Sequence, residues 1–191
     1  TVQHFNVKRD LKKSYAAVYQ LNDNKFVQIA DVELPDAQLP VKGMGDWAIV
    51  STSKPYSLSS MWEGRTRSDY YKVLLATGER TLISEADYAN YRLSSTGKYA
   101  GTYNATDSCW YTINLADNRK IQLTTPQTFP AWDEDNDVPN YPSPHGMAGW
   151  TKGDAALLIY DRYDIWSFDP EGKKAPVRLT KNGRENQVTY R

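Results

Sequence analysis

The fold of this chain is decided by the stretch WYTINLADNRKIQLT (residues 110–124) and by two stretches that resemble it. These are YKVLLATGERTLI (residues 71–83) and IWSFDPEGKKAPVRLT (residues 165–180). Each begins with an aromatic residue in a strand-like run, passes through a polar turn that contains Gly or Asn, and ends in a second short run. Two strands joined by a tight turn form a β-hairpin, so the sequence predicts the same hairpin three times.

The hairpins recur at the length of one propeller blade. Leu75 and Leu115 hold equivalent positions about 40 residues apart, which is the length of four short strands and their turns. The interval from Leu115 to Phe168 is longer, about 53 residues, because it contains a proline-rich insertion at residues 126–146. Upstream of the hairpins, runs such as GDWAIVS (residues 45–51) predict a further strand. We therefore expect an all-β fold, a partial β-propeller of about four antiparallel four-stranded blades.

The repeats also predict the domain organisation. Residues 1–191 are expected to be a fragment of one propeller domain, with the insertion at 126–146 and with blades at residues 17–40, 41–87, 88–125 and 147–191. Residues 188–191 are expected to begin a strand that finds no partner in the chain, and helix is expected only at residues 7–15 and 84–91. A partial propeller leaves strand edges open, so we expect a homo-oligomer that covers them.

Composition and charge exclude several classes of function. The 23 basic residues balance 23 acidic ones, which argues against sequence-independent nucleic-acid binding. No apolar run approaches the roughly 20 residues of a membrane-spanning helix. Cys109 is the only cysteine, so we interpret it as a small buried residue. The aromatic residues Tyr71, Trp110 and Trp166 recur at one position of the repeat, which favours packing between blades over a ligand-stacking platform.

The repeats and one longer stretch resemble a known family. The stretch FPAWDEDNDVPNYPSPHGMAGW (residues 129–150), followed by IYDRYDIWSFDP (residues 159–170), is similar to propellers of Bacteroidetes-type serine peptidases of the prolyl oligopeptidase family. The repeat pattern of residues 17–191 resembles the TolB-like and WD40-like repeats of such propellers. The resemblance implies a non-catalytic propeller that gates and positions peptide for an α/β-hydrolase domain outside this chain. It also implies a periplasmic or secreted protein.

The catalytic half of that family has no counterpart in the sequence. No serine lies in a G-x-S-x-G nucleophile elbow, and no Glu-Glu pair is present to hold a peptide amine as in dipeptidyl peptidases. His145 and His4 share no local spacing, and no activated serine is indicated near either. We therefore expect no enzyme activity and no cofactor in this chain, and a serine peptidase as the parent protein. The alternative is a standalone TolB-like propeller that serves as a protein–protein interaction module.

The first candidate substrate- or interface-facing segment is the turn Asp161-Arg162-Tyr163-Asp164, which lies between two apolar strands. Because Arg162 stands between Asp161 and Asp164, charge-assisted hydrogen bonds can pin this turn to a neighbouring blade. The alternative is a turn that faces the active-site cavity and contacts peptide. We favour the pinning role. Arg65, Arg67 and Asp69 form a second loop with the same two interpretations.

The second candidate segment is the insertion, in which Trp132, Asp133 and Asp135 lie close together. Its prolines make it stiff, so it can project toward the hydrolase domain, the substrate or a partner chain. The acidic run is not a calcium loop, because Val138 replaces the required Gly and Pro144 replaces the required Glu. We interpret it as a solvated acidic loop and expect no metal site.

Overall fold

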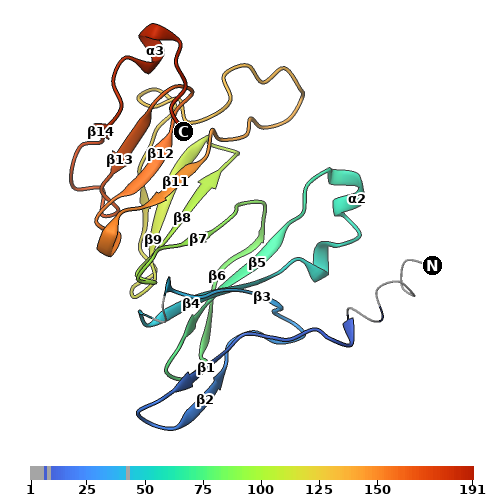
Figure 1. Cartoon of the computed structure of the whole chain (residues 1–191). Coiled ribbons are helices and arrows are strands. Elements are labelled where there is room, and N and C mark those ends of the chain that lie inside the picture. The colour runs from blue at the N-terminus through green and yellow to red at the C-terminus, as the bar shows by residue number, and fades with distance from the viewer. Residues whose placement is uncertain (1–6, 8–9, 42–43) are drawn as a thin grey trace.

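The computed structural model describes residue 7, residues 10–41 and residues 44–191, and it confirms an all-β fold (Figure 1). The strands form four antiparallel sheets, three with four strands and one with two. Between residues 44 and 191, helix is limited to single turns, namely η2 (Lys54–Tyr56), α2 (Ser60–Glu63), η3 (Lys152–Asp154) and α3 (Gly183–Asn186). His4 lies outside the described residues.

Each four-stranded sheet is a meander in which neighbouring strands are also consecutive in the sequence. The first sheet contains β1 (Ala17–Gln20) and β2 (Lys25–Gln28). The second contains β3 (Asp36–Gln38), β4 (Trp47–Thr52), β5 (Ser68–Leu74) and β6 (Arg80–Asp87). The third contains β7 (Arg92–Leu93), β8 (Tyr99–Asn104), β9 (Cys109–Asn114) and β10 (Lys120–Gln122). The fourth contains β11 (Met147–Trp150), β12 (Leu157–Tyr160), β13 (Ile165–Phe168) and β14 (Val177–Arg178). The three predicted hairpins are β5–β6, β9–β10 and β13–β14.

The structure differs from the sequence-based expectation at three places. Strand β3 lies in the range expected for the first repeat but pairs with β4, so the first sheet has two strands rather than four. The helix expected at residues 84–91 is wrong, because Ser84 pairs with Tyr70 as β6 continues to Asp87. Pairing with β5 overrides a weak local preference for helix. Residues 188–191 form no strand, and the Tyr190 amide donates to the Tyr163 carbonyl at 2.7 Å instead.

The helix expected at residues 7–15 lies partly outside the described residues, because residues 8 and 9 are not described. Residues 11 and 12 form a turn, and residues 13–16 belong to no helix or strand.

The hydrophobic core consists of three clusters, each of which lies between two successive sheets. The alternation of side chains along a strand produces this arrangement. On β4, Val50 packs toward the first sheet and Ile49 toward the third. Trp110 of the third sheet and Trp166 of the fourth meet in one cluster, and Tyr71 packs in the cluster between the first and second sheets. The aromatic residues therefore pack between sheets, but Trp110 and Trp166 do so from opposite sides of one interface. Burial of apolar surface between the sheets is therefore the main force that stacks them.

Polar contacts also join neighbouring sheets. The Gln38 side chain of β3 donates to the Tyr91 carbonyl at 2.7 Å and accepts from the Leu93 amide of β7 at 3.0 Å. Lys72 of β5 donates to the Leu115 carbonyl at 2.6 Å, and burial lowers the pKa of its ammonium group. These bonds satisfy polar groups that burial would otherwise leave without partners. The sheets follow one another in chain order, and the first and fourth lie at opposite ends of an open series (Figure 1).

Candidate functional site

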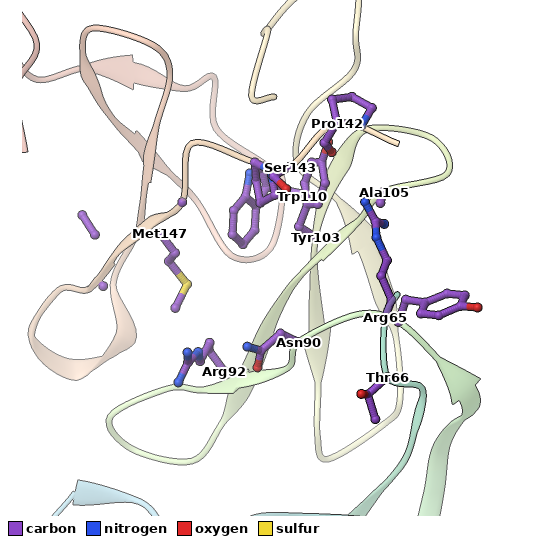
Figure 2. Close-up of a pocket in the computed structure, with 15 residues that line it drawn as sticks. Arg65, Thr66, Asn90, Arg92, Tyr103, Ala105, Trp110, Pro142, Ser143 and Met147 are labelled. Atoms are coloured by element: carbon purple, nitrogen blue, oxygen red, sulfur yellow. The ribbon is translucent and has the colours of Figure 1, made fainter. Parts of the chain in front are cut away.

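A pocket of about 730 Å³ lies where the second, third and fourth sheets meet (Figure 2). Arg65 precedes β5, Asn90 lies between β6 and β7, and Arg92 begins β7. The insertion contributes residues 142–144, and β11 contributes Met147. The volume is within the range of about 300–1,000 Å³ that is usual for small-molecule and cofactor sites. The pocket is thus a candidate binding site that no single sheet forms alone.

The aromatic wall of the pocket comes from the facing ends of β8 and β9. Tyr103 and Trp110 are cross-strand partners, and their ring centroids are 5.5 Å apart. Both side chains are buried, and the Trp110 indole nitrogen Nε1 is buried without a hydrogen-bond partner. Packing against the insertion and the fourth sheet holds these rings in place. The wall therefore offers a rigid apolar surface, and the indole donor of Trp110 within it has no protein partner.

The polar part of the pocket lining is cationic. Arg65 and Arg92 both line the pocket, and no Asp or Glu does. Arg65 donates from Nη2 to the Tyr141 carbonyl at 2.7 Å, and in Figure 2 its side chain extends toward the insertion. Asn90 lies beside Arg92 (Figure 2) and adds a neutral amide. The pocket can therefore bind an anionic group beside an apolar one.

Among these residues, sequence reasoning singled out Arg65, as part of an ambiguous exposed loop, and Trp110, as a residue that packs between blades. Asn90 and Arg92 have no motif around them, and the tyrosine and tryptophan of the wall are typical of any core strand. The residues come from segments up to about 80 positions apart, as the contact of Arg65 with Tyr141 illustrates. Only the stacking of the sheets brings them together.

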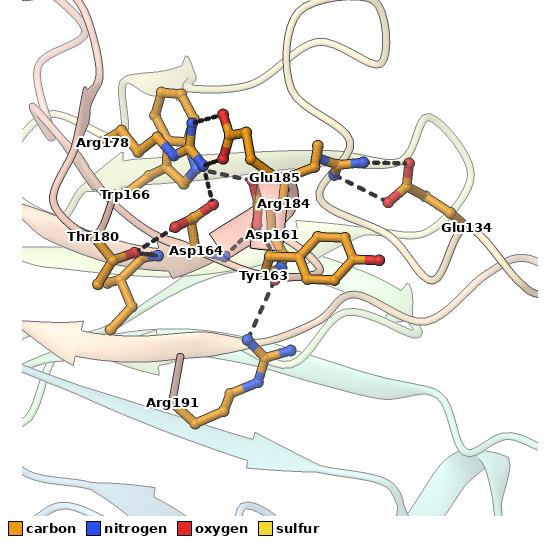
Figure 3. A network of polar contacts seen from close by, with 11 residues as sticks. Glu134, Asp161, Tyr163, Asp164, Trp166, Arg178, Thr180, Arg184, Glu185 and Arg191 are labelled. Atoms are coloured by element: carbon orange, nitrogen blue, oxygen red, sulfur yellow. Dashed lines mark hydrogen bonds and ion pairs between the residues drawn. The ribbon is translucent and has the colours of Figure 1, made fainter. Parts of the chain in front are cut away.

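The turn between β12 and β13 is held together by Asp161 (Figure 3). Its Oδ1 accepts from the amides of Tyr163 at 2.7 Å and Asp164 at 2.5 Å. Its Oδ2 accepts from the indole nitrogen of Trp166 at 3.0 Å. Asp161 is buried, so these three bonds replace the water that its carboxylate loses. Asp161 thus stabilises the turn from within.

Asp164 joins the same turn to the edge of the fourth sheet. Its side chain is fully buried and accepts from Arg178 at 2.5 Å and from Thr180 at 2.8 Å. Burial alone would raise the pKa of Asp164, but the hydrogen bonds from Arg178 and Thr180 outweigh it and hold this pKa below its usual value. Glu185 of α3 also pairs with Arg178, at 3.0 Å. Asp164 therefore stays ionised and organises a structural network.

Arg162 connects the turn to the insertion rather than to a neighbouring blade hairpin. Its guanidinium lies 2.7 Å from the Asp135 carboxylate. A second ion pair, between Arg184 of α3 and Glu134, joins the same two segments at 3.2 Å (Figure 3). Both pairs are partly exposed, so each contributes little by itself. Together they show how the acidic run of the insertion lies against the C-terminal end of the described chain.

The remaining candidates, Trp132 and Asp133, lie at the base of the insertion. Trp132 forms a β-bridge with Pro144 and packs against the core cluster that contains Phe129. The Asp133 amide donates to the Ser143 carbonyl at 2.8 Å. None of the six residues expected to face substrate or an interface lines the pocket. Asp161, Arg162 and Asp164 lie in the turn between β12 and β13, Arg162 pairs with Asp135, and Trp132 packs against the apolar core.

Nucleophilic or metal chemistry finds little support among the described residues. His145 is partly buried, and its Nε2 is buried without a hydrogen-bond partner. Burial, and then the charge of Arg191, lowers the pKa of this imidazole. Cys109 is buried, and burial raises the pKa of its thiol, which disfavours the reactive thiolate. Within the described ranges, no group of three or more His, Cys, Asp or Glu residues is placed to hold a metal ion.

Comparisons with known proteins do not assign this chain to a family. Neither the protein-family models nor the curated proteins include a match to this chain. In the part of the chain that the structure describes, no helix is both long enough and apolar enough to cross a membrane.

Proposed function

We propose that this chain is a non-catalytic β-propeller segment that gates and positions peptide for the α/β-hydrolase domain of a serine peptidase of the prolyl oligopeptidase type. The observation that carries the proposal is the series of three consecutive four-stranded meanders, each packed on the next through an apolar cluster. Such units, repeated in chain order, are the building principle of a propeller. On this proposal the two-stranded first sheet is part of a further blade.

The position of the pocket supports a binding role. Arg92 lies on β7 and Met147 on β11, and each of these strands is the first strand and one edge of its sheet. In a propeller the first strands of successive blades line the central channel. A ligand in this pocket would therefore occupy the channel side of the blades. That is where a peptide would pass toward a catalytic domain mounted on the propeller.

The side chains indicate which step, binding or hydrolysis, this chain can perform. The sequence contains no G-x-S-x-G elbow, and the pocket lining contains no histidine. A chain of this kind can bind and orient peptide but cannot supply the nucleophile and its base. The hydrolytic step belongs to the separate domain that the resemblance implies.

A second candidate is a standalone propeller that binds a protein partner. The observation that favours it is the exposed apolar tip between β4 and β5. Met61 and Trp62 of α2 and the neighbouring Leu58 are all more than 70% exposed. Exposed apolar side chains that gather on one loop are typical of protein-interaction surfaces. This loop projects away from the sheets (Figure 1).

The coding sequence that follows Arg191 distinguishes the two candidates. The peptidase proposal requires a downstream G-x-S-x-G, with Asp and then His later in the chain. It also requires the isolated chain to bind peptides without cleaving them, as measured by calorimetry and by mass spectrometry of the recovered peptide. Further blades followed by a stop codon would contradict the peptidase proposal and support the interaction module.

A further inference from the structure

The nine described arginines of this protein differ in their partners. Six of the described arginines form an ion pair with a carboxylate: Arg67, Arg80, Arg119, Arg162, Arg178 and Arg184. Arg65 and Arg92 form no such pair, and both line the pocket. Arg65 is committed only to the neutral Tyr141 carbonyl, and the Arg92 guanidinium has no hydrogen bond or ion pair within the described part of the chain. Arg191 also lacks a carboxylate partner, but it donates to three backbone carbonyls outside the pocket. Two of the three described arginines without a counter-charge thus line the pocket.

The pocket has no internal anion to neutralise these two charges. Its lining contains no Asp or Glu, and its other polar groups, such as Asn90 and Ser143, are neutral. A guanidinium presents several donors in a fixed plane that matches the two oxygens of a carboxylate. Arg92 retains all of these donors, whereas Arg65 has used one on Tyr141. A ligand carboxylate would therefore gain most from Arg92.

The aromatic wall beside the two arginines favours a ligand with an apolar part. Tyr103 and Trp110 are at most 7% exposed, and Met147 is packed against the same cluster. The buried Trp110 Nε1 has no partner, so a ligand acceptor that reached it would satisfy a donor that the protein leaves unused. A site of this composition suits a ligand that combines an apolar side chain with a negative charge.

We propose that the pocket recognises a carboxylate of a peptide, next to an apolar residue, through Arg92 and secondarily Arg65. This inference rests on the proposed peptide-binding function and names its substrate class. The carboxylate can be the C-terminus of the peptide or the side chain of an Asp or Glu. Both sources present the same planar anion to the guanidinium.

Isothermal titration calorimetry of the whole chain with N-acetylated peptides tests the proposal. The probes are acetyl-Ala-Leu-Phe-Ala as the free acid, the same peptide as the C-terminal amide, and acetyl-Ala-Leu-Phe-Glu as the amide. We expect the acid to bind about tenfold more tightly than its amide, the difference that one charge-assisted pair supplies. If the Glu peptide also binds about tenfold more tightly than the Ala amide, the site recognises any peptide carboxylate. If the Glu peptide binds no more tightly than the Ala amide, the site recognises the C-terminus.

Variants of single arginines show which side chain causes the preference for the acid peptide. Arg92→Gln should abolish the preference, so that the acid and the amide bind with equal affinity, and Arg65→Gln should reduce the preference by less. Arg119→Gln is the matched control, because it removes the same charge from an exposed turn at the opposite end of β9. Circular dichroism and thermal unfolding check that each variant is folded. A preference for the acid that survives Arg92→Gln, or is lost equally in Arg119→Gln, overturns the assignment.

The outcomes also separate this inference from the proposed function. Equal affinity of the unmodified chain for the acid, the amide and the Glu peptide overturns carboxylate recognition and leaves peptide binding intact. If 3-phenylpropionate binds in an Arg92-dependent way while no peptide binds, the peptide function is contradicted and the anion site stands. If neither class of probe binds, both proposals fail.

Discussion

At the scale of single residues, two kinds of charged group can be distinguished. Asp161 and Asp164 are buried, and the protein itself satisfies them fully. Arg65 and Arg92 are exposed to the pocket and lack a carboxylate partner. Removing one partner of a buried, satisfied charge destabilises the fold, whereas an unpaired charge in a concave site is available to a ligand. Of the sequence-based candidates, Asp161 and Asp164 belong to the first kind, and the two pocket arginines belong to the second.

Replacement of Asp164 by Asn should destabilise the protein by about 2–3 kcal/mol, because Arg178 loses its buried counter-charge. Urea unfolding followed by circular dichroism measures this change. Asp135→Asn is the control, since its carboxylate is 68% exposed and its pair with Arg162 should contribute less than about 1 kcal/mol. Equal losses in the two variants would contradict the structural role assigned to Asp164.

His145 should make the stability depend on pH. Burial lowers the pKa of His145 in the folded state, so below its ordinary pKa of about 6.5 the unfolded chain takes up the proton first. The free energy of unfolding should therefore fall as the pH falls from 7.5 to 5. The fall should be smaller in His145→Gln, measured by urea unfolding at both pH values. An unchanged slope in the variant would show that carboxylates alone account for the dependence.

At the scale of elements, the insertion has two parts with different roles. Its base enters the core, where Phe129 and Ala131 are buried and Phe129 packs edge-on against Trp166 and Phe168. Its tip, which includes Val138, is exposed. The sequence predicts a projecting stiff loop throughout, but the apolar residues at its start instead fill the space between the third and fourth sheets. The insertion is thus a structural connection that carries an exposed acidic tip.

Phe129→Ala should therefore cost about 3–5 kcal/mol, since a large side chain leaves a cavity between two sheets. Val138→Ala at the exposed tip should change the stability by less than about 0.5 kcal/mol. Thermal unfolding monitored by tryptophan fluorescence compares the two variants. Similar midpoints for both would mean that the base of the insertion does not contribute to the core.

At the scale of the whole molecule, the four sheets form an open series rather than a closed ring (Figure 1). The first sheet has two strands, and Tyr19, Leu21 and Phe26 on it are all more than half exposed. Exposed apolar side chains beside open strand edges favour association with another chain. We propose that a homo-oligomer covers this surface.

The isolated chain should therefore self-associate as its concentration rises. Sedimentation velocity over a hundredfold concentration range should show a shift from monomer to a larger species. Phe26→Ser should weaken this shift, and Tyr141→Ser, which removes an exposed aromatic residue from the insertion, should not. A purely monomeric mass at the highest concentration would contradict the expectation.

The sequence by itself determined the all-β class, the three hairpins and the recurrence of aromatic residues between sheets. These features follow from local turn chemistry and from side-chain alternation, which act over a few residues. The same local rules misassigned residues 84–91, where pairing with β5 decided the conformation. They also placed β3 in the wrong repeat, because a three-residue strand such as Asp36–Gln38 carries too little pattern to identify its partner.

Only the tertiary structure decided the candidate site. Arg65, Arg92 and Trp110 come from three separate segments, and no short motif links them. Their proximity depends on which apolar faces stack against each other, and that is settled by burial over the whole chain rather than by any one segment. Tertiary structure likewise decided which charges are paired. An arginine in a sequence becomes a structural residue or a ligand-binding one according to the carboxylates that folding brings to it.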